Sequence, residues 1–220
     1  MSFRQQYGLW GRFVHAAFLL ALALLAPQAA AQSPREVRIL ALGDSLTAGY
    51  GLPAGRGFVP QLQAQLRRHG VAATVIDAGV SGDTAAAGQA RLGWTLDGLD
   101  RPPTLAIVAL GGNDMLRGLP PAQARAALDS ILTELGRRNI PVVLAGMRAA
   151  PNLGPDYIRA FEGMYPALAR KHNAALHPFF LEGVAGNRAL NLADGIHPNV
   201  VGIKRMVSGI TPVVLQALER

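Results

Sequence analysis

Short apolar runs alternate with longer amphipathic segments from residue 37 to residue 218. Each run is followed by glycine, proline or aspartate, which is typical of strands buried on both faces of a parallel sheet. The predicted strands cover residues 37–42, 72–76, 104–110, 141–145 and 174–177. The predicted helices cover 58–69, an alanine-rich segment from 84, a segment from 120, 156–171 and about 200–218. This alternation predicts βαβ units and an α/β fold with helices on both faces of the sheet.

The first 31 residues have a different pattern. They contain Arg4 and Arg12 and no acidic residue, and an apolar run over 13–26 precedes three alanines that end before Gln32. These are the three parts of a secretory signal peptide, and the run is shorter than the roughly 20 residues that a membrane-spanning helix needs. We expect export after cleavage of residues 1–31, to the periplasm or, as the alternative, into the medium. An uncleaved membrane anchor is the other interpretation of this segment.

The remaining residues, 32–220, suffice for one domain with a sizeable core and are too few for two ordinary domains. The chain has no cysteine, so neither disulfides nor thiolate metal sites can stabilise it. The net charge is +7, but the basic residues are scattered and form no stripe with interleaved aromatic residues, which argues against a nucleic-acid partner. We expect a monomer that is not inserted in a membrane once the leader is removed.

A serine lies in the turn after the first predicted strand, in the sequence Gly43-Asp44-Ser45-Leu46. Ligands of open α/β sheets bind outside the carboxyl ends of the strands, so this position suits a nucleophile. The alternative is that Asp44 or Ser45 only caps the next helix, as these residue types often do. The choice depends on the other polar blocks of the chain.

Acyl transfer by a serine requires a base, a group that orients the base, and donors for the oxyanion. His197 is the candidate base, and Asp194, three residues earlier, can accept its other ring N–H. The candidate oxyanion donors are the backbone N–H groups of Ser45 and Gly82 and the side-chain amide of Asn113. A metal site on Asp194 and His197 would need further ligands that the sequence does not supply, so we expect no metal and no cofactor. Because the base must be neutral, activity should rise with pH through roughly 6 to 7.

Four polar blocks, in this order, resemble those of the GDSL, or SGNH, hydrolase family. They are Gly43-Asp44-Ser45-Leu46, Ser81-Gly82-Asp83-Thr84, Gly111-Gly112-Asn113-Asp114 and Asp194-Gly195-Ile196-His197-Pro198-Asn199. Within the family, residues 48–51, 116–120 and 147–152 are most similar to the bacterial periplasmic thioesterase I, lysophospholipase and arylesterase group. The resemblance implies a flavodoxin-like three-layer α/β/α sandwich whose five-stranded parallel sheet has the order 2-1-3-4-5. It also implies a single SGNH hydrolase domain over 32–220 and the roles given above for the five site residues.

The resemblance further implies an acyl groove bordered by the loop after the fourth strand. Its expected lining residues are Met115, Met147, Pro151 and Ile196. Met115 stands where the family carries a small residue, which leaves the acyl-chain preference open.

The combined expectation is an exported serine esterase with a Ser-His-Asp acyl-enzyme mechanism. Aryl and acyl esters are the expected substrates, with acyl thioesters and lysophospholipids as further candidates. A carbohydrate O-acetylesterase acting on cell-envelope glycans is one alternative, because the same fold and triad could support it. A non-catalytic flavodoxin-like binding module is the other, although such a module has no need for Asp194 and His197 together.

Overall fold

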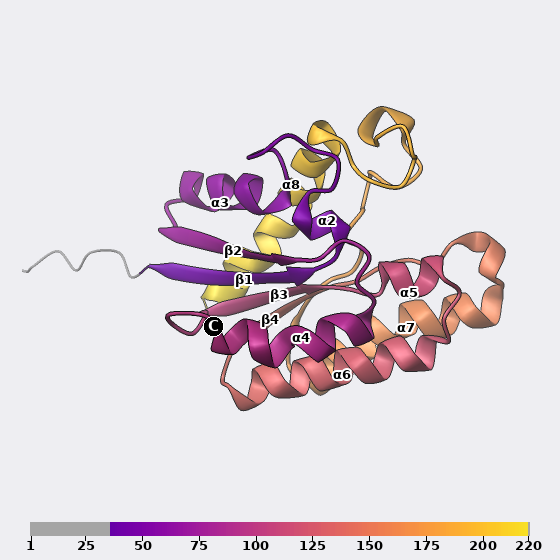
Figure 1. The fold of residues 1–220 in the computed structure, drawn as a ribbon, viewed down its shortest axis with the longest axis horizontal. Helices are drawn as coiled ribbons and strands as arrows, with labels where there is room; N and C mark the ends of the chain where they lie inside the picture. The colour runs from indigo at the N-terminus through magenta and orange to yellow at the C-terminus, as the bar shows by residue number, and fades with distance from the viewer. Residues whose placement is uncertain (1–35, 220) are drawn as a thin grey trace, which may run out of the picture. The chain divides into compact units, whose positions relative to one another are not determined.

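The computed structural model describes residues 36–219 and has a five-stranded parallel sheet at its centre (Figure 1). The strands are β1 (Val37–Gly43), β2 (Ala73–Gly79), β3 (Leu105–Ala109), β4 (Val142–Ala145) and β5 (Ala175–His177). Their order is β2-β1-β3-β4-β5, and every neighbouring pair is parallel. The predicted α/β fold and strand order are therefore confirmed. The predicted leader, residues 1–31, lies outside the described residues.

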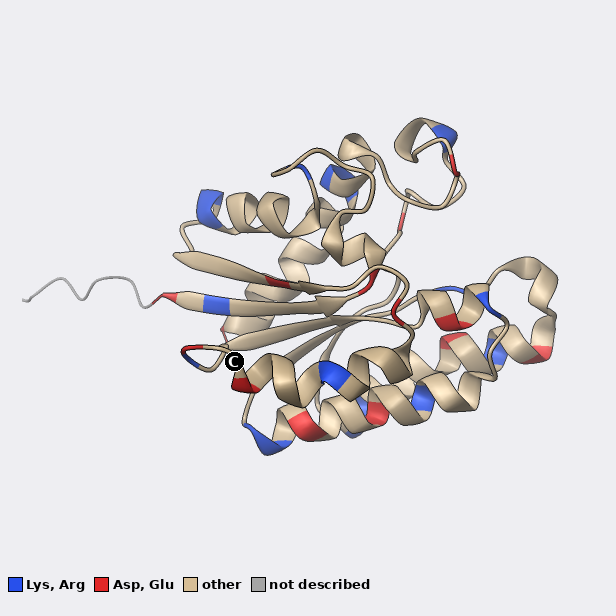
Figure 2. Ribbon diagram, in the orientation of Figure 1, with Lys and Arg blue, Asp and Glu red and all other residues tan. Residues whose placement is uncertain are grey.

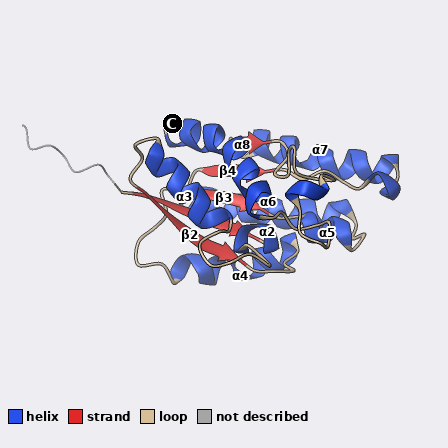
Figure 3. Ribbon diagram, turned by 90° about the horizontal axis from the view of Figure 1, so that it is seen from above, coloured by secondary structure: helices blue, strands red, loops and turns tan. Residues whose placement is uncertain are grey.

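Helices cover both faces of the sheet, which makes a three-layer sandwich (Figures 1 and 3). One face carries α3 (Phe58–Arg68) and α8 (Val200–Leu218), and the other carries α4 (Ala85–Asp97), α6 (Pro121–Arg137) and α7 (Pro155–Lys171). Two short helices, α2 (Ser45–Ala48) and α5 (Gly112–Leu116), directly follow β1 and β3, and 3-10 turns cover Pro151–Leu153 (η1) and Arg188–Leu190 (η2).

The core lies between the sheet and these helices. All five residues of β3 are buried, because helices pack on both of its faces. Within residues 36–219, α8 is the one helix long and apolar enough to cross a membrane. Its residues Ile203, Ile210 and Val214 are at most 1% exposed and belong to the hydrophobic core, so we interpret α8 as a core helix.

Two segments differ from the predicted pattern. β2 continues to Gly79 instead of ending at residue 76, because Asp77 and Ala78 stay in parallel register with β1. The carboxylate of Asp77 is exposed and accepts the Gly79 N–H, so a polar residue is tolerated on this edge strand. Residues Gly112–Leu116 form α5, where the sequence predicted only a polar block after a strand.

Charged residues are distributed over helices and loops, with both signs interspersed (Figure 2). The basic pairs stand in the last turns of helices: Arg67 and Arg68 end α3, and Arg170 and Lys171 end α7. Cations at these positions interact favourably with the helix dipole. In this view, the Lys and Arg positions are spread over several helices and loops (Figure 2).

Candidate active site

Ser45 lies just after the carboxyl end of β1, an inner strand between β2 and β3. The strand ends at Gly43, Asp44 is the N-cap of α2, and Ser45 is the first residue of that helix. A Cβ at Gly43 would clash with the side chain of Thr47, so this tight strand-to-helix turn requires glycine. The Asp44 carboxylate accepts the Leu46 N–H at 3.0 Å. The capping interpretation is therefore correct for Asp44, and it leaves the Ser45 hydroxyl available.

Ser45, His197 and Asp194 form a continuous hydrogen-bonded row. The His197 Nε2 atom lies 3.0 Å from Ser45 Oγ, and His197 Nδ1 lies 2.7 Å from Asp194 Oδ2. These distances suit proton transfer from the hydroxyl to the ring and orientation of the ring by the carboxylate. The structure thus brings together three residues that the sequence placed in catalytic roles, and those roles stay predictions.

The loop that carries Asp194 and His197 is closed by its own hydrogen bonds. Leu192 donates its N–H to the His197 carbonyl at 2.7 Å, and an isolated antiparallel bridge joins Asn191 to Pro198. Asp194 Oδ1 accepts the backbone N–H groups of Ile196 at 2.9 Å and His197 at 3.0 Å. The hydrogen bonds from the backbone and ring of His197 and from the backbone of Ile196 lower the pKa of Asp194 to about 2. The carboxylate therefore stays charged wherever His197 could act as a base.

The predicted oxyanion donors lie near Ser45, at the carboxyl edge of the sheet. Neither the backbone N–H of Ser45 nor that of Gly82 has a hydrogen-bond partner within residues 36–219. The Asn113 amide donates to Asp83 O at 3.0 Å and to Asp44 Oδ2 at 3.2 Å. Because Asp44 precedes Ser45 and Asp83 follows Gly82, these bonds tie the amide to the chain beside both other donors.

Asp44 is a buried carboxylate next to Ser45, and only 2% of the residue is exposed. Desolvation raises the pKa of Asp44 to about 6. The hydrogen bonds from Leu46 and Asn113 and the nearby His197 oppose this shift. The sequence suggested only a helix cap here. The observed contact with Asn113, 69 residues away, could not be inferred from local spacing.

Three further residues support the site and were given no role in it from the sequence. Tyr50 packs its ring on His197 with 4.5 Å between the centroids. Asp114 accepts the Ala85 N–H at 2.8 Å and so holds the start of α4. Tyr165, fully buried, donates to the Leu110 carbonyl just before the turn that carries Asn113. Asp114 belongs to the third polar block and Tyr50 to residues 48–51, which is a usable signal, whereas Tyr165 lies in a helix with no such signal.

The four residues expected to line an acyl groove differ in exposure. Met147 is buried, and its methyl group would contact a Cβ placed at Gly112. Met115 is partly buried against the core, whereas Pro151 and Ile196 are exposed. Their common role in an acyl groove stays a prediction.

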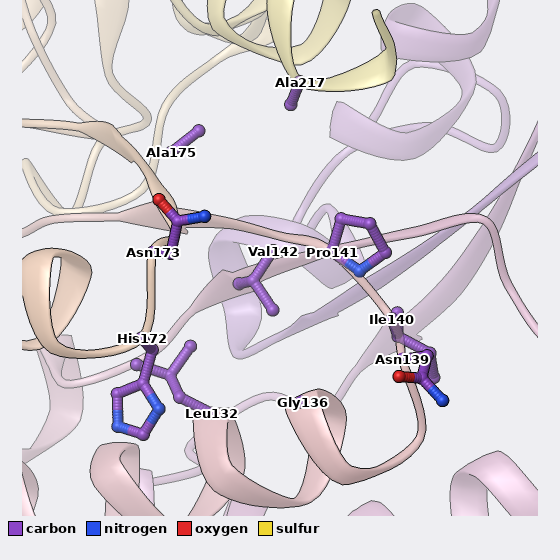
Figure 4. A pocket seen from close by; sticks show the side chains of 10 residues that line it. All are labelled: Leu132, Gly136, Asn139, Ile140, Pro141, Val142, His172, Asn173, Ala175 and Ala217. Carbon is purple, nitrogen blue, oxygen red and sulfur yellow. The ribbon is translucent and has the colours of Figure 1, made fainter. Parts of the chain in front are cut away.

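The pocket in Figure 4 lies at the opposite edge of the sheet, at the amino ends of β4 and β5. Its lining includes Asn139, Val142, His172 and Ala217, and none of the predicted site residues. We assign the chemistry to the site around Ser45, because the hydrogen-bonded side chains of Ser45, His197 and Asp194 lie there. In the described part of the chain, no group of three or more His, Asp or Glu side chains is arranged to hold a metal ion.

Comparison with known proteins agrees with this geometry. The model of the GDSL-like lipase/acylhydrolase family matches residues 41–205. The chain is 42% identical to Esterase TesA of Pseudomonas aeruginosa over 195 residues, which cover 89% of this chain and 94% of that protein. It is 37% identical to Thioesterase 1/protease 1/lysophospholipase L1 of Escherichia coli K12 over 185 residues, 84% of each chain. The crystal structure of AlinE4, an SGNH-hydrolase family esterase, matches with a TM-score of 0.72 and 52% identity, covering 84% of this chain and 98% of that chain.

Proposed function

Since the chain belongs to the GDSL-like lipase/acylhydrolase family and is an ester-hydrolysing serine hydrolase, we propose that Ser45 is its nucleophile, His197 its base and Asp194 the orienting carboxylate. The observation that carries this assignment is the row of contacts at 3.0 Å and 2.7 Å that joins the three side chains. If Asp194 and His197 formed only a surface hydrogen bond, the Ser45 hydroxyl would not need to lie within hydrogen-bonding distance of His197.

In the proposed reaction, His197 Nε2 takes the Ser45 Oγ proton as the oxygen attacks the ester carbonyl. The carbonyl oxygen becomes an anion that the N–H groups of Ser45 and Gly82 stabilise. The Asn113 amide joins them by exchanging its longer bond, at 3.2 Å to Asp44 Oδ2, for the oxyanion, while it keeps its bond to Asp83 O. His197 then gives its proton to the leaving alcohol or thiol, and an acyl-Ser45 ester remains. Water, deprotonated by His197, attacks this ester and releases the acid, which restores the free serine.

We expect aryl esters and short- to medium-chain acyl esters to be substrates, with acyl thioesters and lysophospholipids in second place. The second group is supported by the name of the E. coli relative, which describes a thioesterase and a lysophospholipase. An exposed apolar rim also supports acyl substrates: Tyr50 and Ile196, each beside or against His197, are 53% and 47% exposed.

The test is hydrolysis of p-nitrophenyl esters, from acetate to palmitate, by residues 32–220 and its Ser45→Ala variant. Loss of a triad nucleophile lowers kcat by about a million-fold. Ser208→Ala is the matched control, because Ser208 is exposed and its hydroxyl donates only to the Lys204 carbonyl of the same helix, and this variant should keep wild-type activity. A phosphonate ester should add one adduct to the wild type and to Ser208→Ala, and none to Ser45→Ala.

Two results would contradict the proposal. Comparable activity in wild type and Ser45→Ala would exclude Ser45 as the nucleophile. A folded wild type that hydrolyses no member of the series and takes no phosphonate would exclude esterase activity on these substrates and favour acetylated glycans or a binding role.

We further propose that residues 1–31 direct export to the periplasm and are removed before Gln32. The support is the basic start, the apolar run and Ala29-Ala30-Ala31. Mass spectrometry of the protein from the periplasmic fraction should give an N-terminus at Gln32. Replacement of both Ala29 and Ala31 by leucine should block cleavage and leave the precursor in the membrane fraction. An intact N-terminus in the wild-type protein would support the membrane-anchor alternative.

A further inference from the structure

Arg91 is a charged side chain of α4 that the proposed chemistry does not use. Its side chain is only 17% exposed, although it lies on a helix that borders the solvent. It donates to three acceptors, which are Asp83 Oδ2 at 2.6 Å, the Ala78 carbonyl at 2.7 Å and the Gly43 carbonyl at 3.0 Å. One planar guanidinium therefore connects the end of β1, the end of β2 and the loop that follows β2.

Two of the three acceptors lie close along the chain to a group that we assign to the oxyanion hole. Gly43 is two residues before Ser45, and Asp83 directly follows Gly82. The backbone carbonyl of Asp83 also accepts the Asn113 amide at 3.0 Å. Arg91 thus contacts the chain beside all three donors that must converge on one oxygen atom. It bonds Gly43 on the Ser45 side, and it bonds Asp83, which adjoins Gly82 and accepts the Asn113 amide.

We propose that Arg91 is a positioning residue of the oxyanion hole, which fixes the relative placement of the Ser45, Gly82 and Asn113 donors. This inference rests on the proposed function, because it assigns a role to the environment of those donors. Preorganised donors are effective only when they already point to the position of the developing charge, and small displacements of reacting groups cost about 100-fold in rate.

The chemistry of arginine suits this task better than that of lysine. The guanidinium is planar, always charged and presents N–H groups in a fixed fork, so it can bond a carboxylate and two carbonyls without rearrangement. Asp83, whose side chain is 12% exposed, is its ion-pair partner, and a charge-assisted hydrogen bond in such a site is short and directional. A lysine ammonium at position 91 keeps the charge but offers no such fork.

Arg38 provides a matched control at the other end of the same strand. Its side chain is 12% exposed and pairs with Asp100. It lies five residues before Gly43 on β1, roughly 16 Å from the site end of the strand. Arg38→Met therefore removes a mostly buried arginine and its ion pair, as Arg91→Met does, without touching the carboxyl edge of the sheet.

The experiment compares Arg91→Met, Arg91→Lys, Arg38→Met and Ser45→Ala. The readouts are kcat and KM with p-nitrophenyl butyrate, the Tm, and the Ki of an alkyl trifluoromethyl ketone, which forms a tetrahedral oxyanion adduct with a serine. We expect kcat to fall about 100-fold in Arg91→Met and about 10-fold in Arg91→Lys, with KM changed less than about 3-fold. The Ki should rise in parallel with the loss of kcat/KM. Arg38→Met should lower the Tm and keep kcat within about 2-fold of the wild type.

The inference is overturned if kcat in both Arg91 variants stays within about 3-fold of the wild type. It is also overturned if Arg38→Met loses as much kcat as they do at the same loss of Tm, because the effect is then one of general stability. If Arg91→Met does not fold, Arg91→Lys decides by the same criteria. Activity that survives in Ser45→Ala would instead contradict the proposed mechanism, whatever the Arg91 variants do.

Discussion

The two oxygens of the Asp194 carboxylate have different partners. Oδ1 accepts two backbone N–H groups of its own loop, and Oδ2 faces His197 Nδ1. A single carboxylate therefore shapes the loop and orients the base. The two functions can be separated, because an asparagine has one oxygen that can stay on the backbone and one amide that cannot accept from Nδ1–H.

Asp194→Asn should therefore lower kcat by about a thousand- to ten-thousand-fold with little loss of stability. The amide would favour the ring tautomer in which Nε2 carries the proton and cannot accept from Ser45, and comparable changes in other serine hydrolases have effects of this size. The measurements are kcat and Tm. Asp194→Ala, which loses the backbone contacts as well, should lower both. More than a tenth of wild-type kcat in Asp194→Asn would refute the orienting role.

Gly111 occupies a position that no other residue can take without strain. Its φ is +109°, and a Cβ there would clash with the hydroxyl of Tyr165. Left-handed backbone costs about 1–2 kcal/mol for a residue with a Cβ, and an added methyl in a packed core costs about 1–3 kcal/mol.

We expect Gly111→Ala to lower the free energy of unfolding by roughly 3 kcal/mol or more, measured by urea denaturation. Gly118→Ala is the matched control, because Gly118 has a φ of +62° and no atom within 4 Å of the new Cβ. It should lose only about 1 kcal/mol. Tyr165→Phe should restore part of the loss when combined with Gly111→Ala. Equal losses in the two alanine variants would show that contact with Tyr165 contributes nothing.

The start of α8 and the loop of the acid–base pair share one side chain. Asn199 Oδ1 accepts the N–H groups of Val201 and Gly202, both at 3.0 Å. Its amide donates to the carbonyls of Ala189 at 2.9 Å and Asn191 at 3.3 Å. Asn199 thus joins α8 directly to the loop that presents His197, which lies two residues before Asn199.

Asn199→Ala should lower the free energy of unfolding by about 1–2 kcal/mol, the usual effect of losing a cap, and should lower kcat several-fold because the loop loosens. Asn199→Asp keeps the cap but cannot donate to the two carbonyls, so it should retain more stability and lose a similar part of kcat. Asn187→Ala removes a one-bond cap of η2 and should keep the wild-type kcat. A wild-type kcat in Asn199→Asp would show that the hydrogen bonds from the Asn199 amide do not affect catalysis.

The elements themselves were predictable because their signals are local. Strand runs such as 141–145 and the helix at 156–171 follow from spacing and punctuation over a few residues. The parallel order also places every polar block at the carboxyl edge, which is why the site residues could be named in advance. The prediction that β2 ends at residue 76 was wrong, because pairing with β1 extends the strand through Asp77 to Gly79.

Contacts between distant elements could not be predicted from these signals. Arg91 reaches a carbonyl 48 residues earlier, and Tyr165 reaches one 55 residues earlier. Neither residue interrupts the helical spacing in which it lies. The requirement for glycine at position 111 likewise depends on Tyr165, so the Gly-Gly pair could be recognised as a turn but not explained.

A titratable carboxylate in the interior makes the stability of the whole molecule depend on pH. Burial raises the pKa of Asp44 to about 6, against about 3.9 for an unfolded aspartate. Between these values the folded state holds the proton more tightly than the unfolded chain. The contribution of Asp44 to stability is therefore greatest below about pH 4 and is lost as pH rises to about 6, with a limit of about 3 kcal/mol.

The free energy of unfolding of Asp44→Asn, relative to the wild type, should thus increase by about 1–3 kcal/mol from pH 4.5 to pH 7. Asparagine cannot ionise, and its oxygen can still accept the Leu46 N–H. Urea denaturation at several pH values measures the difference. Asp156→Asn, at an aspartate whose side chain is 92% exposed, should show no such trend. A constant difference between Asp44→Asn and the wild type would mean that Asp44 does not titrate in this range.

The same titration should appear in catalysis, because protonated Asp44 no longer holds the Asn113 amide and the Leu46 N–H as a charged acceptor. His197 must also lose its proton to act as a base. Protonation of Asp44 is therefore an additional cause of lost activity in the wild type, and kcat/KM should fall as pH drops below about 6. In Asp44→Asn the plateau should be about 10-fold lower, and the loss below about pH 6 should be smaller than in the wild type, because asparagine cannot take up a proton there. Profiles of the same shape in both proteins would separate Asp44 from the chemistry and leave it as a helix cap.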